Sequence, residues 1–284
     1  MNEAPVLGVI GGSGLYDLPG LEDVHTVHPE TPYGKASSPI VIGLLAGRRI
    51  AFLTRHGIGH IYNPSEVNYR ANIFTFKQLG VKKIVSISAC GSLREDFAPG
   101  DIVIPDQLVD FTRDRKRSFF EGGIVAHIGV AEPFCGTMRQ YARNSLAATG
   151  AMVHFGGTLI TVEGPRFSTR AESNLFRSWG IAIIGMTTSP EAFLAREAEI
   201  CYCSIAHVTD YDVWHTSEAP VSVEMVVRTL TKNTETAQQS LRNLVKDPGL
   251  IAECACHSAL KDAVITHPDA MTETARNKLA GLIG

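Results

Sequence analysis

The stretch that decides the fold is Ile200–Trp214, with the sequence ICYCSIAHVTDYDVW. Its first half is apolar and rich in β-forming residues, and it contains neither glycine nor proline. This composition predicts a strand that is buried on both faces, as in a parallel sheet covered by helices. Strand-like and helix-like segments alternate along the rest of the chain. We therefore expect an α/β fold with a central mixed, largely parallel β-sheet flanked by helices.

The end of this stretch is abruptly polar. Thr209, Asp210 and Asp212 arrive together, beside Tyr211 and Trp214. In open α/β sheets, ligands bind beyond the carboxyl ends of the strands. Two carboxylates beside two aromatic rings at that place suit a flat, polar, partly basic molecule. The alternative is a loop in which the aspartates cap the following helix.

Composition excludes several classes of protein. A net charge of −3 leaves no basic surface for nucleic acid or for an anionic membrane. No apolar run approaches the roughly 20 residues needed to span a bilayer, and the N-terminus lacks the basic start of a secretory signal. Six cysteines in 284 residues are too few for a disulfide scaffold, so we expect a reducing cytoplasm. With no linker in view, we expect one domain over 1–284, with a core over about 5–247 and a C-terminal tail over 248–284.

A glycine-rich turn follows the first predicted strand. Residues Val6–Gly14 read VLGVIGGSG, with Ser13 as the hydroxyl residue. Glycines allow backbone N–H groups to point toward an anion, and a serine hydroxyl adds a donor. The spacing differs from the G-x-G-x-x-G of dinucleotide-binding folds. The alternative is a tight turn without a ligand.

Further polar groups follow other predicted strands. Arg49–Thr54, the second strand of a predicted hairpin, leads directly into Arg55 and His56, and an arginine fork matches a phosphate. Surface charge is the alternative for this pair. Ser88 and Ala89 near the end of the next strand offer a hydroxyl and a backbone N–H, unless both are satisfied locally.

Five strand ends therefore carry polar groups, and they predict an anion site and an acidic site on one edge of the sheet. These groups are Ser13, Arg55-His56, Ser88-Ala89, Met186-Thr187 and Asp210-Asp212.

Four other segments have simpler predictions. We expect mostly loop over Leu21–Ser38, because it is polar and contains prolines, and an exposed charged loop over Arg113–Gly123. A 3.6-residue period predicts a helix over Ser65–Leu79 that Ser65 caps. Met152–Val162 reads as one strand.

The tail carries Cys254, Cys256 and His257. Structural zinc sites use four ligands, and this segment supplies too few. We therefore expect no metal site.

Taken together, the polar motifs resemble those of the 5′-methylthioadenosine phosphorylases in the trimeric purine nucleoside phosphorylase family. The resemblance covers about residues 5–247, and the motifs stand in the family's order. They are Gly11-Gly12-Ser13-Gly14, Arg55-His56-Gly57, Asn68-Tyr69-Arg70-Ala71-Asn72, Ala89-Cys90-Gly91-Ser92-Leu93, Glu163-Gly164-Pro165-Arg166-Phe167-Ser168 and Thr209-Asp210-Tyr211-Asp212.

The resemblance implies a homotrimeric pentosyltransferase of purine and methionine salvage that needs no cofactor. Inorganic phosphate, as co-substrate, would attack C1′ of 5′-methylthioadenosine and release adenine and 5-methylthioribose 1-phosphate. The nearest alternative is a broader 6-aminopurine nucleoside phosphorylase that acts on adenosine or 5′-deoxyadenosine. A hydrolase would leave Arg55, His56 and Ser88 without a purpose, and a non-catalytic purine-binding protein would need no phosphate clamp.

The resemblance also implies a role for each site residue. The phosphate site would be Ser13, Arg55, His56, Ser88, Ala89 and Thr187. The nucleoside would be held by Met186 at the ribose, by Phe167, Asp210 and Asp212 at the base, and by Val223, Val226 and Val227 at the 5′-methylthio group. His127 of a neighbouring subunit would close that last pocket.

The expected chemistry assigns Asp210 as the general acid. Cleavage of the glycosidic bond places positive charge on the ribose and negative charge on the purine, so N7 needs a proton donor. A carboxyl close to Asp212 in a partly dry pocket should have a raised pKa, because two like charges resist ionising together. Asp212 would then accept from the 6-amino group of adenine, which favours 6-aminopurines over 6-oxopurines.

Overall fold

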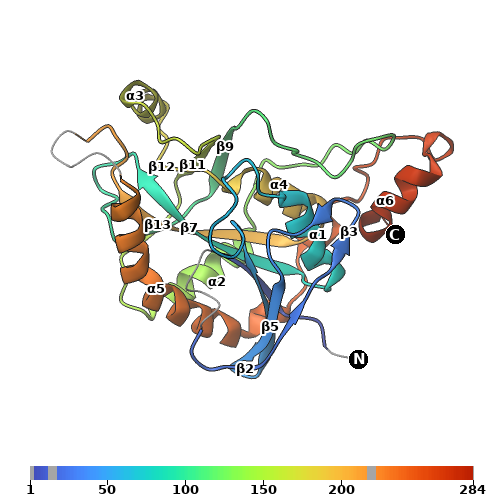
Figure 1. Ribbon diagram of the computed structural model, residues 1–284, viewed down its shortest axis with the longest axis horizontal. Helices are drawn as coiled ribbons and strands as arrows, with labels where there is room; N and C mark the ends of the chain where they lie inside the picture. Colours follow the sequence, from blue (N-terminus) through green and yellow to red (C-terminus); the bar gives the residue numbers. More distant parts are fainter. Residues whose placement is uncertain (1–2, 12–17, 216–221, 284) are drawn as a thin grey trace.

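The structure is a computed structural model that describes residues 3–11, 18–215 and 222–283 (Figure 1). In these residues, eleven strands form one sheet whose main path runs β10-β8-β13-β7-β1-β6-β5-β2. The strands of the sheet are β1 (Leu7–Gly11), β2 (Leu21–Val27), β5 (Ile40–Leu45), β6 (Arg48–Thr54), β7 (Lys83–Ser92), β8 (Ile102–Ile104), β9 (Gln107–Phe111), β10 (Val153–Phe155), β11 (Thr158–Val162), β12 (Ile183–Gly185) and β13 (Cys201–Asp210). A separate two-stranded sheet joins β3 (Glu30–Thr31) to β4 (Gly34–Lys35).

The centre of the sheet is parallel, and antiparallel pairs join it to flanking strands, where β10 pairs with β8 and β11 pairs with β9 and β12 in parallel again. Strands β13, β7, β1 and β6 all run in the same direction. The β5–β6, β2–β5, β8–β13 and β7–β12 pairs are antiparallel. A side branch of the sheet is formed by β12, β11 and β9. The predicted mixed, largely parallel sheet is therefore confirmed.

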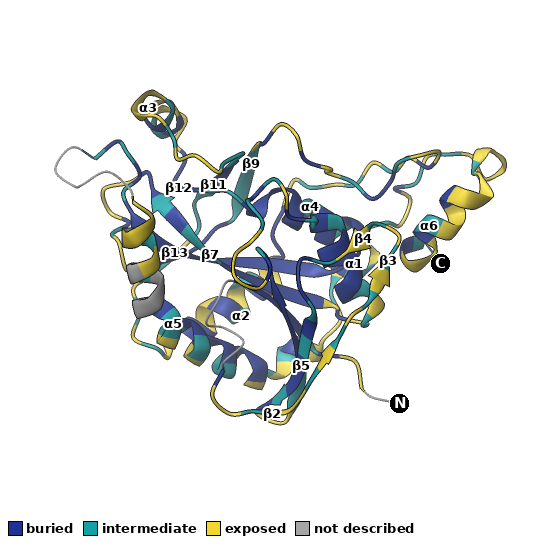
Figure 2. Ribbon diagram, in the orientation of Figure 1, coloured by how far each residue is buried: buried dark blue, intermediate teal, exposed yellow. Residues whose placement is uncertain are grey.

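Helices cover both faces of the sheet. On one face α1 (Tyr69–Gln78) packs beside α4 (Thr188–Glu197), and on the other α2 (Gly136–Ala147) packs beside α5 (Val223–Lys246) (Figure 1). Successive side chains of β13 enter these two layers, since Tyr202 belongs to the first core and Cys201 and Cys203 belong to the second. All ten residues of β13 are buried, as predicted. Figure 2 shows this buried centre between helices whose outer sides are exposed.

The remaining elements lie around this core. α3 (Arg170–Ser178) follows the side branch of the sheet. The tail contains three short 3₁₀ helices and α6, which packs against α1. They are η1 (Pro248–Ile251), η2 (Ala255–Ser258), η3 (Pro268–Ala270) and α6 (Glu273–Ile283). Within the described residues, no helix combines the length and the apolar character required to cross a membrane.

Four local predictions were wrong. Leu21–Ser38 contains β2, which pairs with β5 at the edge of the sheet; its polar residues reflect an exposed face, not a loop. The predicted Ser65 helix begins at Tyr69 and is capped by Asn68. Met152–Val162 forms two strands that are separated by Gly156 and Gly157, both with positive φ. Arg113–Gly123 is not simply exposed, because Arg115 and Phe119 are buried.

Candidate active site

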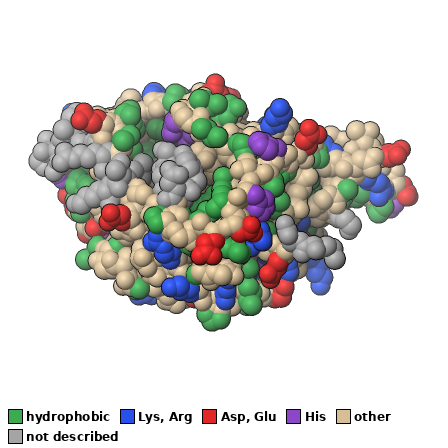
Figure 3. Space-filling model, turned by 60° about the horizontal axis from the view of Figure 1, so that its bottom comes forward, with side chains coloured by type: hydrophobic (Ala, Val, Ile, Leu, Met, Phe, Trp, Pro, Cys, Tyr) green, Lys and Arg blue, Asp and Glu red, His purple; other side chains and the backbone are tan. Residues whose placement is uncertain are grey.

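The parallel strands deliver the predicted polar residues to one cavity of about 700 Å³. It lies at the end of the sheet where β6, β7 and β13 finish. Its lining includes Arg55, His56, Ser88, Ala89, Phe167, Met186, Thr187, Asp210, Asp212, Val223, Val226 and Val227. Figure 3 shows one face of the molecule, on which hydrophobic and histidine side chains gather beside a hollow.

Two predicted residues are not among the described residues that line this cavity. Ser13 lies outside the described residues. His127 is exposed elsewhere on the chain, where its backbone N–H donates to the Ala263 carbonyl at 2.9 Å. Its predicted place is in the cavity of a neighbouring subunit, so that role stays a prediction.

Arg55 is buried at the end of β6 and is held by a carboxylate. Its Nε donates to Glu191 Oε1 at 2.9 Å, and its Nη2 donates to Glu191 Oε2 at 3.1 Å and to Ser86 Oγ at 2.6 Å. Tyr202 also donates from its hydroxyl to Glu191 Oε2, at 2.6 Å. Nη1 has only a long contact of 3.5 Å to the Ile87 carbonyl among the described residues. Nη1 can therefore donate to a ligand in the cavity.

His56, the next residue, is held as a neutral imidazole. Its Nδ1 lies 2.9 Å from the Tyr62 carbonyl oxygen, which can only accept a hydrogen bond. Nδ1 therefore carries the ring proton and donates to that oxygen. Burial, reinforced by the charge of Arg55, lowers the pKa of His56 to about 4. The ring stacks on His60 with the centroids 4.3 Å apart. Nε2 is therefore a hydrogen-bond acceptor at neutral pH.

Hydroxyl and backbone groups stand between the cation and the carboxylates. Ser88 and Ala89 belong to β7, which is separated from β6 by β1 and is next to β13. Thr187 precedes α4 and makes no side-chain capping bond to it in the described structure. In the first turn of α4, the Ser189 backbone N–H donates to Thr161 Oγ1 at 3.1 Å, and Pro190 has no N–H.

A bulge in β13 directs the acidic residues. The register with β7 shifts after Val208, so that Asp210 pairs with Gly91. Asp210 is fixed through both oxygens: Oδ2 lies 2.6 Å from Thr209 Oγ1, and Oδ1 accepts from the Asp212 backbone N–H at 2.8 Å. A Cβ atom on Gly91 would lie 2.9 Å from Asp210 Oδ1, so glycine is needed there for space.

The two carboxyl groups differ in whether each oxygen has a hydrogen-bond partner. Asp212 has positive φ, and its buried Oδ2 has no hydrogen-bond partner among the described residues. Burial raises the pKa of Asp210, and the adjacent charge of Asp212 raises it further. Burial likewise raises the pKa of Asp212. One protonated and one ionised carboxyl group can coexist in such a pair.

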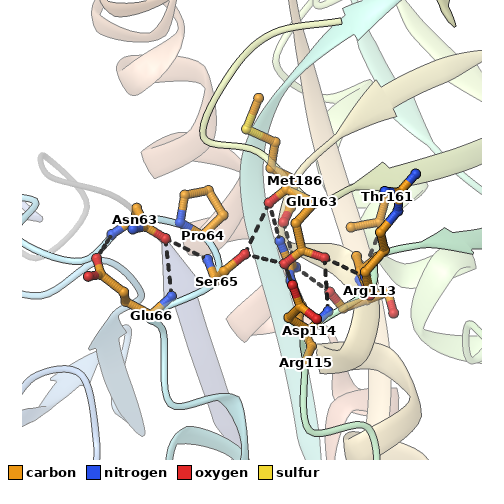
Figure 4. A network of polar contacts seen from close by, with 12 residues as sticks. Asn63, Pro64, Ser65, Glu66, Arg113, Asp114, Arg115, Thr161, Glu163 and Met186 are labelled. Atoms are coloured by element: carbon orange, nitrogen blue, oxygen red, sulfur yellow. Dashed lines mark hydrogen bonds and ion pairs between the residues drawn. The ribbon is translucent and has the colours of Figure 1, made fainter.

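A buried arginine ties the walls of the cavity together (Figure 4). Arg115 Nη1 donates to the carbonyl oxygens of Met186 and Ser189, at 2.7 Å each, and Nη2 donates to the Glu163 carbonyl at 2.7 Å. The Glu163 carboxylate accepts from Ser65 Oγ and from Arg115 Nε. Ser65, predicted as a helix cap, instead anchors this network. The network fixes Met186 in the cavity wall.

The far side of the cavity is apolar and open. Val223 and Val227 of α5 are 69% and 55% exposed, and Phe167 is 38% exposed. Ile61 also lines the cavity and is 66% exposed. Apolar side chains at a cavity mouth indicate contact with a ligand or with another protein surface.

Glu191, Arg115 and Glu163 have positions in this site that the sequence did not reveal. Glu191 lies among the apolar residues of a helix that begins directly after Met186-Thr187. A charged residue in such an apolar helix is the feature of the sequence that could have indicated a role in the site. Arg115 lies in a segment with several charges and has no comparable signal.

Comparison with known proteins shows the family of this chain. The profile of the phosphorylase superfamily matches residues 6–246. S-methyl-5′-thioadenosine phosphorylase of Koribacter versatilis is 50% identical over 98% of this chain and 95% of its own length. The enzyme of the same name from Thermofilum pendens is 48% identical over 91% of this chain and 98% of its own length.

Solved structures extend the comparison. A methylthioadenosine phosphorylase from an Antarctic soil metagenomic library is 44% identical, with a TM-score of 0.94 over the full length of both chains. Methylthioadenosine phosphorylase from Schistosoma mansoni, solved with adenine, is 36% identical, with a TM-score of 0.85 over 94% of this chain and all of that one. This chain therefore belongs to the phosphorylase superfamily and, within it, to the family of the methylthioadenosine phosphorylases.

Proposed function

We propose that this chain catalyses the phosphorolysis of 5′-methylthioadenosine to adenine and 5-methylthioribose 1-phosphate. One observation carries the proposal: the same cavity is lined by a buried arginine directly after β6 and by two buried carboxyl groups, one at the end of β13 and one two residues further on. Three strand spacings separate β6 from β13 in the order β6-β1-β7-β13. At about 4.8 Å per spacing, this is about 14 Å, which leaves room for a nucleoside and a phosphate ion between them.

The phosphate ion would bind at the Arg55 end. Arg55 Nη1 would donate to one oxygen, and the hydroxyls of Ser13, Ser88 and Thr187 with the Ala89 N–H would serve the others. Because the Nδ1–H of His56 is engaged with Tyr62, Nε2 would accept the proton of hydrogen phosphate. The deprotonated phosphate oxygens are thereby turned toward the ribose.

The base would bind at the Asp210 end. A phosphate oxygen forms a bond to C1′ while the C1′–N9 bond breaks, and the electron pair of that bond moves into the purine. The carboxyl proton of Asp210 is transferred to N7, so neutral adenine leaves. Asp212 Oδ2, which has a free lone pair, would accept from the 6-amino group. Phe167 would cover the base and Met186 would contact the ribose.

The 5′-methylthio group would occupy the apolar side formed by Val223, Val226 and Val227. His127 of a neighbouring subunit would close this side, which makes the working unit a homotrimer. The exposure of Val223 and Val227 supports such a cover. We also propose that the enzyme works as one domain over 1–284 in the cytoplasm, without a cofactor, in purine and methionine salvage.

Substrate selectivity tests the proposal. In saturating phosphate, kcat/KM should decrease from 5′-methylthioadenosine to 5′-deoxyadenosine and adenosine, and inosine should be the poorest substrate. Equal values for the three adenine nucleosides would favour the broader 6-aminopurine phosphorylase. His127→Ala should raise KM for 5′-methylthioadenosine more than KM for adenosine, whereas equal increases would remove His127 from the 5′ pocket.

A further inference from the structure

Four cysteines from three separate segments converge on one point far from the cavity. Cys135 caps α2, Cys201 begins β13, and Cys254 and Cys256 lie in the tail at η2. Their four sulfur atoms all lie within 4.8 Å of one another, and Cys135 and Cys254 are 3.7 Å apart. Three of the four side chains are buried, and Cys254 is half-buried.

These distances match a tetrahedral metal site. Four thiolates at about 2.3 Å from a zinc ion stand about 3.8 Å from one another. A disulfide requires about 2.05 Å between two sulfurs, and all six cysteines of the chain are free thiols. A disulfide also joins sulfurs in pairs, whereas here four sulfurs share one centre.

The surroundings supply N–H groups that point at the sulfurs from outside the cluster. The Met138 backbone N–H donates to Cys135 Sγ at 3.5 Å, and Arg196 Nη1 donates to Cys256 Sγ at 3.2 Å. His257 places Nε2 3.5 Å from Cys201 Sγ. A Zn²⁺ ion with four thiolates has a net charge of −2, and the guanidinium of Arg196 offsets part of it. Such outer donors orient thiolate ligands and stabilise their charge.

We propose that Cys135, Cys201, Cys254 and Cys256 bind one Zn²⁺ ion in a structural site. Four protein ligands leave no open position for water or substrate, which is the arrangement of structural sites. Cys201 and Asp210 stand at opposite ends of β13; nine residues of strand, at about 3.3 Å each, separate them by about 30 Å. The metal therefore has no part in phosphorolysis.

The function of the site is to fasten the tail to the core. The ion joins the segment that precedes α6 to the starts of α2 and β13. Lys83 Nζ assists by donating to the Ala252 carbonyl at 2.5 Å. Considering only the tail, the sequence offered too few ligands for zinc; the fold adds Cys135 and Cys201.

The first test is the zinc content of the purified, untagged full chain, measured by mass spectrometry of the metal. The sample is incubated anaerobically with Zn²⁺ and a non-chelating reductant and then desalted. The site predicts close to one zinc per chain for the wild type and for Cys203→Ala, and close to none for Cys254→Ala. Cys203 is a matched control, because it is a buried cysteine on the same strand outside the cluster. Less than about a tenth of an equivalent in the wild type would overturn the proposal.

A second measurement does not depend on a folded variant. Replacement of the metal in the wild type by Co²⁺ should produce the visible bands of a tetrahedral centre and the strong near-ultraviolet band of thiolate ligation. Removal of the metal by a chelator should lower the melting temperature by several degrees and leave kcat at 25 °C within twofold of its original value. Absence of the Co²⁺ bands, or an intact mass that shows oxidised pairs among these cysteines in the purified protein, would contradict the site.

Discussion

Glu191 binds Arg55 through both carboxylate oxygens: Oε1 accepts from Nε at 2.9 Å, and Oε2 accepts from Nη2 at 3.1 Å. Both side chains are almost fully buried, with 3% and 0% exposure. A buried guanidinium needs such a partner, because an unpaired charge inside a protein is costly. Because Arg55 also lines the cavity, its position there depends on this pair, and in the proposed function so does phosphate binding.

Glu191→Gln should therefore act on phosphate binding more than on the chemical step. We expect KM for phosphate to rise about tenfold or more, because Arg55 loses its charged anchor. The change in kcat at saturating phosphate should be several-fold smaller. Steady-state kinetics with phosphate as the varied substrate measures both quantities.

Glu197→Gln is the matched control for that variant. Glu197 is a buried carboxylate on the same helix, but it accepts from Ser118 Oγ and from the Phe119 backbone N–H, both at 2.7 Å, outside the cavity. KM for phosphate should stay within twofold of the wild type. Equal increases in both variants would show that loss of helix stability, not positioning of Arg55, is responsible.

Arg115→Met should weaken nucleoside binding, although Arg115 is not one of the residues that line the cavity. The variant removes the donors to the Met186, Ser189 and Glu163 carbonyls, and displacements of about 1 Å in a site can cost up to about 100-fold. We expect kcat/KM for the nucleoside to fall at least about tenfold. Arg117→Met should change it less than twofold, since Arg117 pairs with Asp110 near the surface. An unchanged kcat/KM in Arg115→Met would exclude this positioning role.

Asp210→Asn tests the general acid. Asparagine cannot supply a proton to N7, so kcat with 5′-methylthioadenosine should fall by about 100-fold or more. Burial raises the pKa of Asp210; in the wild type, kcat decreases as pH rises through that raised pKa, because the acid form disappears. The variant should lack this alkaline decrease and should shift its preference toward 6-oxopurine nucleosides. Unchanged kinetics with both types of base would refute the assignment.

His207 makes stability depend on pH. It is buried in β13 without a hydrogen-bond partner among the described residues, and burial lowers its pKa to about 4. The unfolded chain, with the ordinary pKa of about 6.5, binds the proton more readily. The folded state therefore loses no stability through His207 above pH 6.5. As pH falls toward 4, the free energy of unfolding decreases, by about 2 kcal/mol at pH 5.

His207→Leu removes this pH-dependent loss of stability. The melting temperature of the variant should therefore decrease less than that of the wild type between pH 7.5 and pH 5. Both proteins are compared at one fixed concentration. Parallel decreases would show that His207 does not contribute to the acid sensitivity.

The sequence predicted the centre of the fold better than its edges. β13 was recognised because ten residues buried on both faces leave a continuous apolar pattern. β2 was missed because one face is in solvent and its pairing with β5 depends on the tertiary fold. The break at Gly156 and Gly157 was also missed, although two glycines with positive φ explain it.

The same distinction holds for the site. Side chains that follow a strand, such as Arg55 and Asp210, can be placed at a sheet edge from the sequence, because strand direction fixes where they emerge. Partners that reach these residues across the fold cannot. Glu191 meets Arg55 over 136 residues, and Arg115 meets Met186 over 71. Nothing in the local sequence indicates a partner so far away along the chain.

The proposed reaction in this cavity is transfer of the 5-methylthioribosyl group to phosphate. Its most direct test is the release of adenine from 5′-methylthioadenosine by the purified protein, with and without inorganic phosphate. Release should depend on phosphate, with one 5-methylthioribose 1-phosphate formed per adenine. Adenine release at the same rate without phosphate, with free 5-methylthioribose as the product, would contradict it and would remove the role assigned to Arg55 and His56.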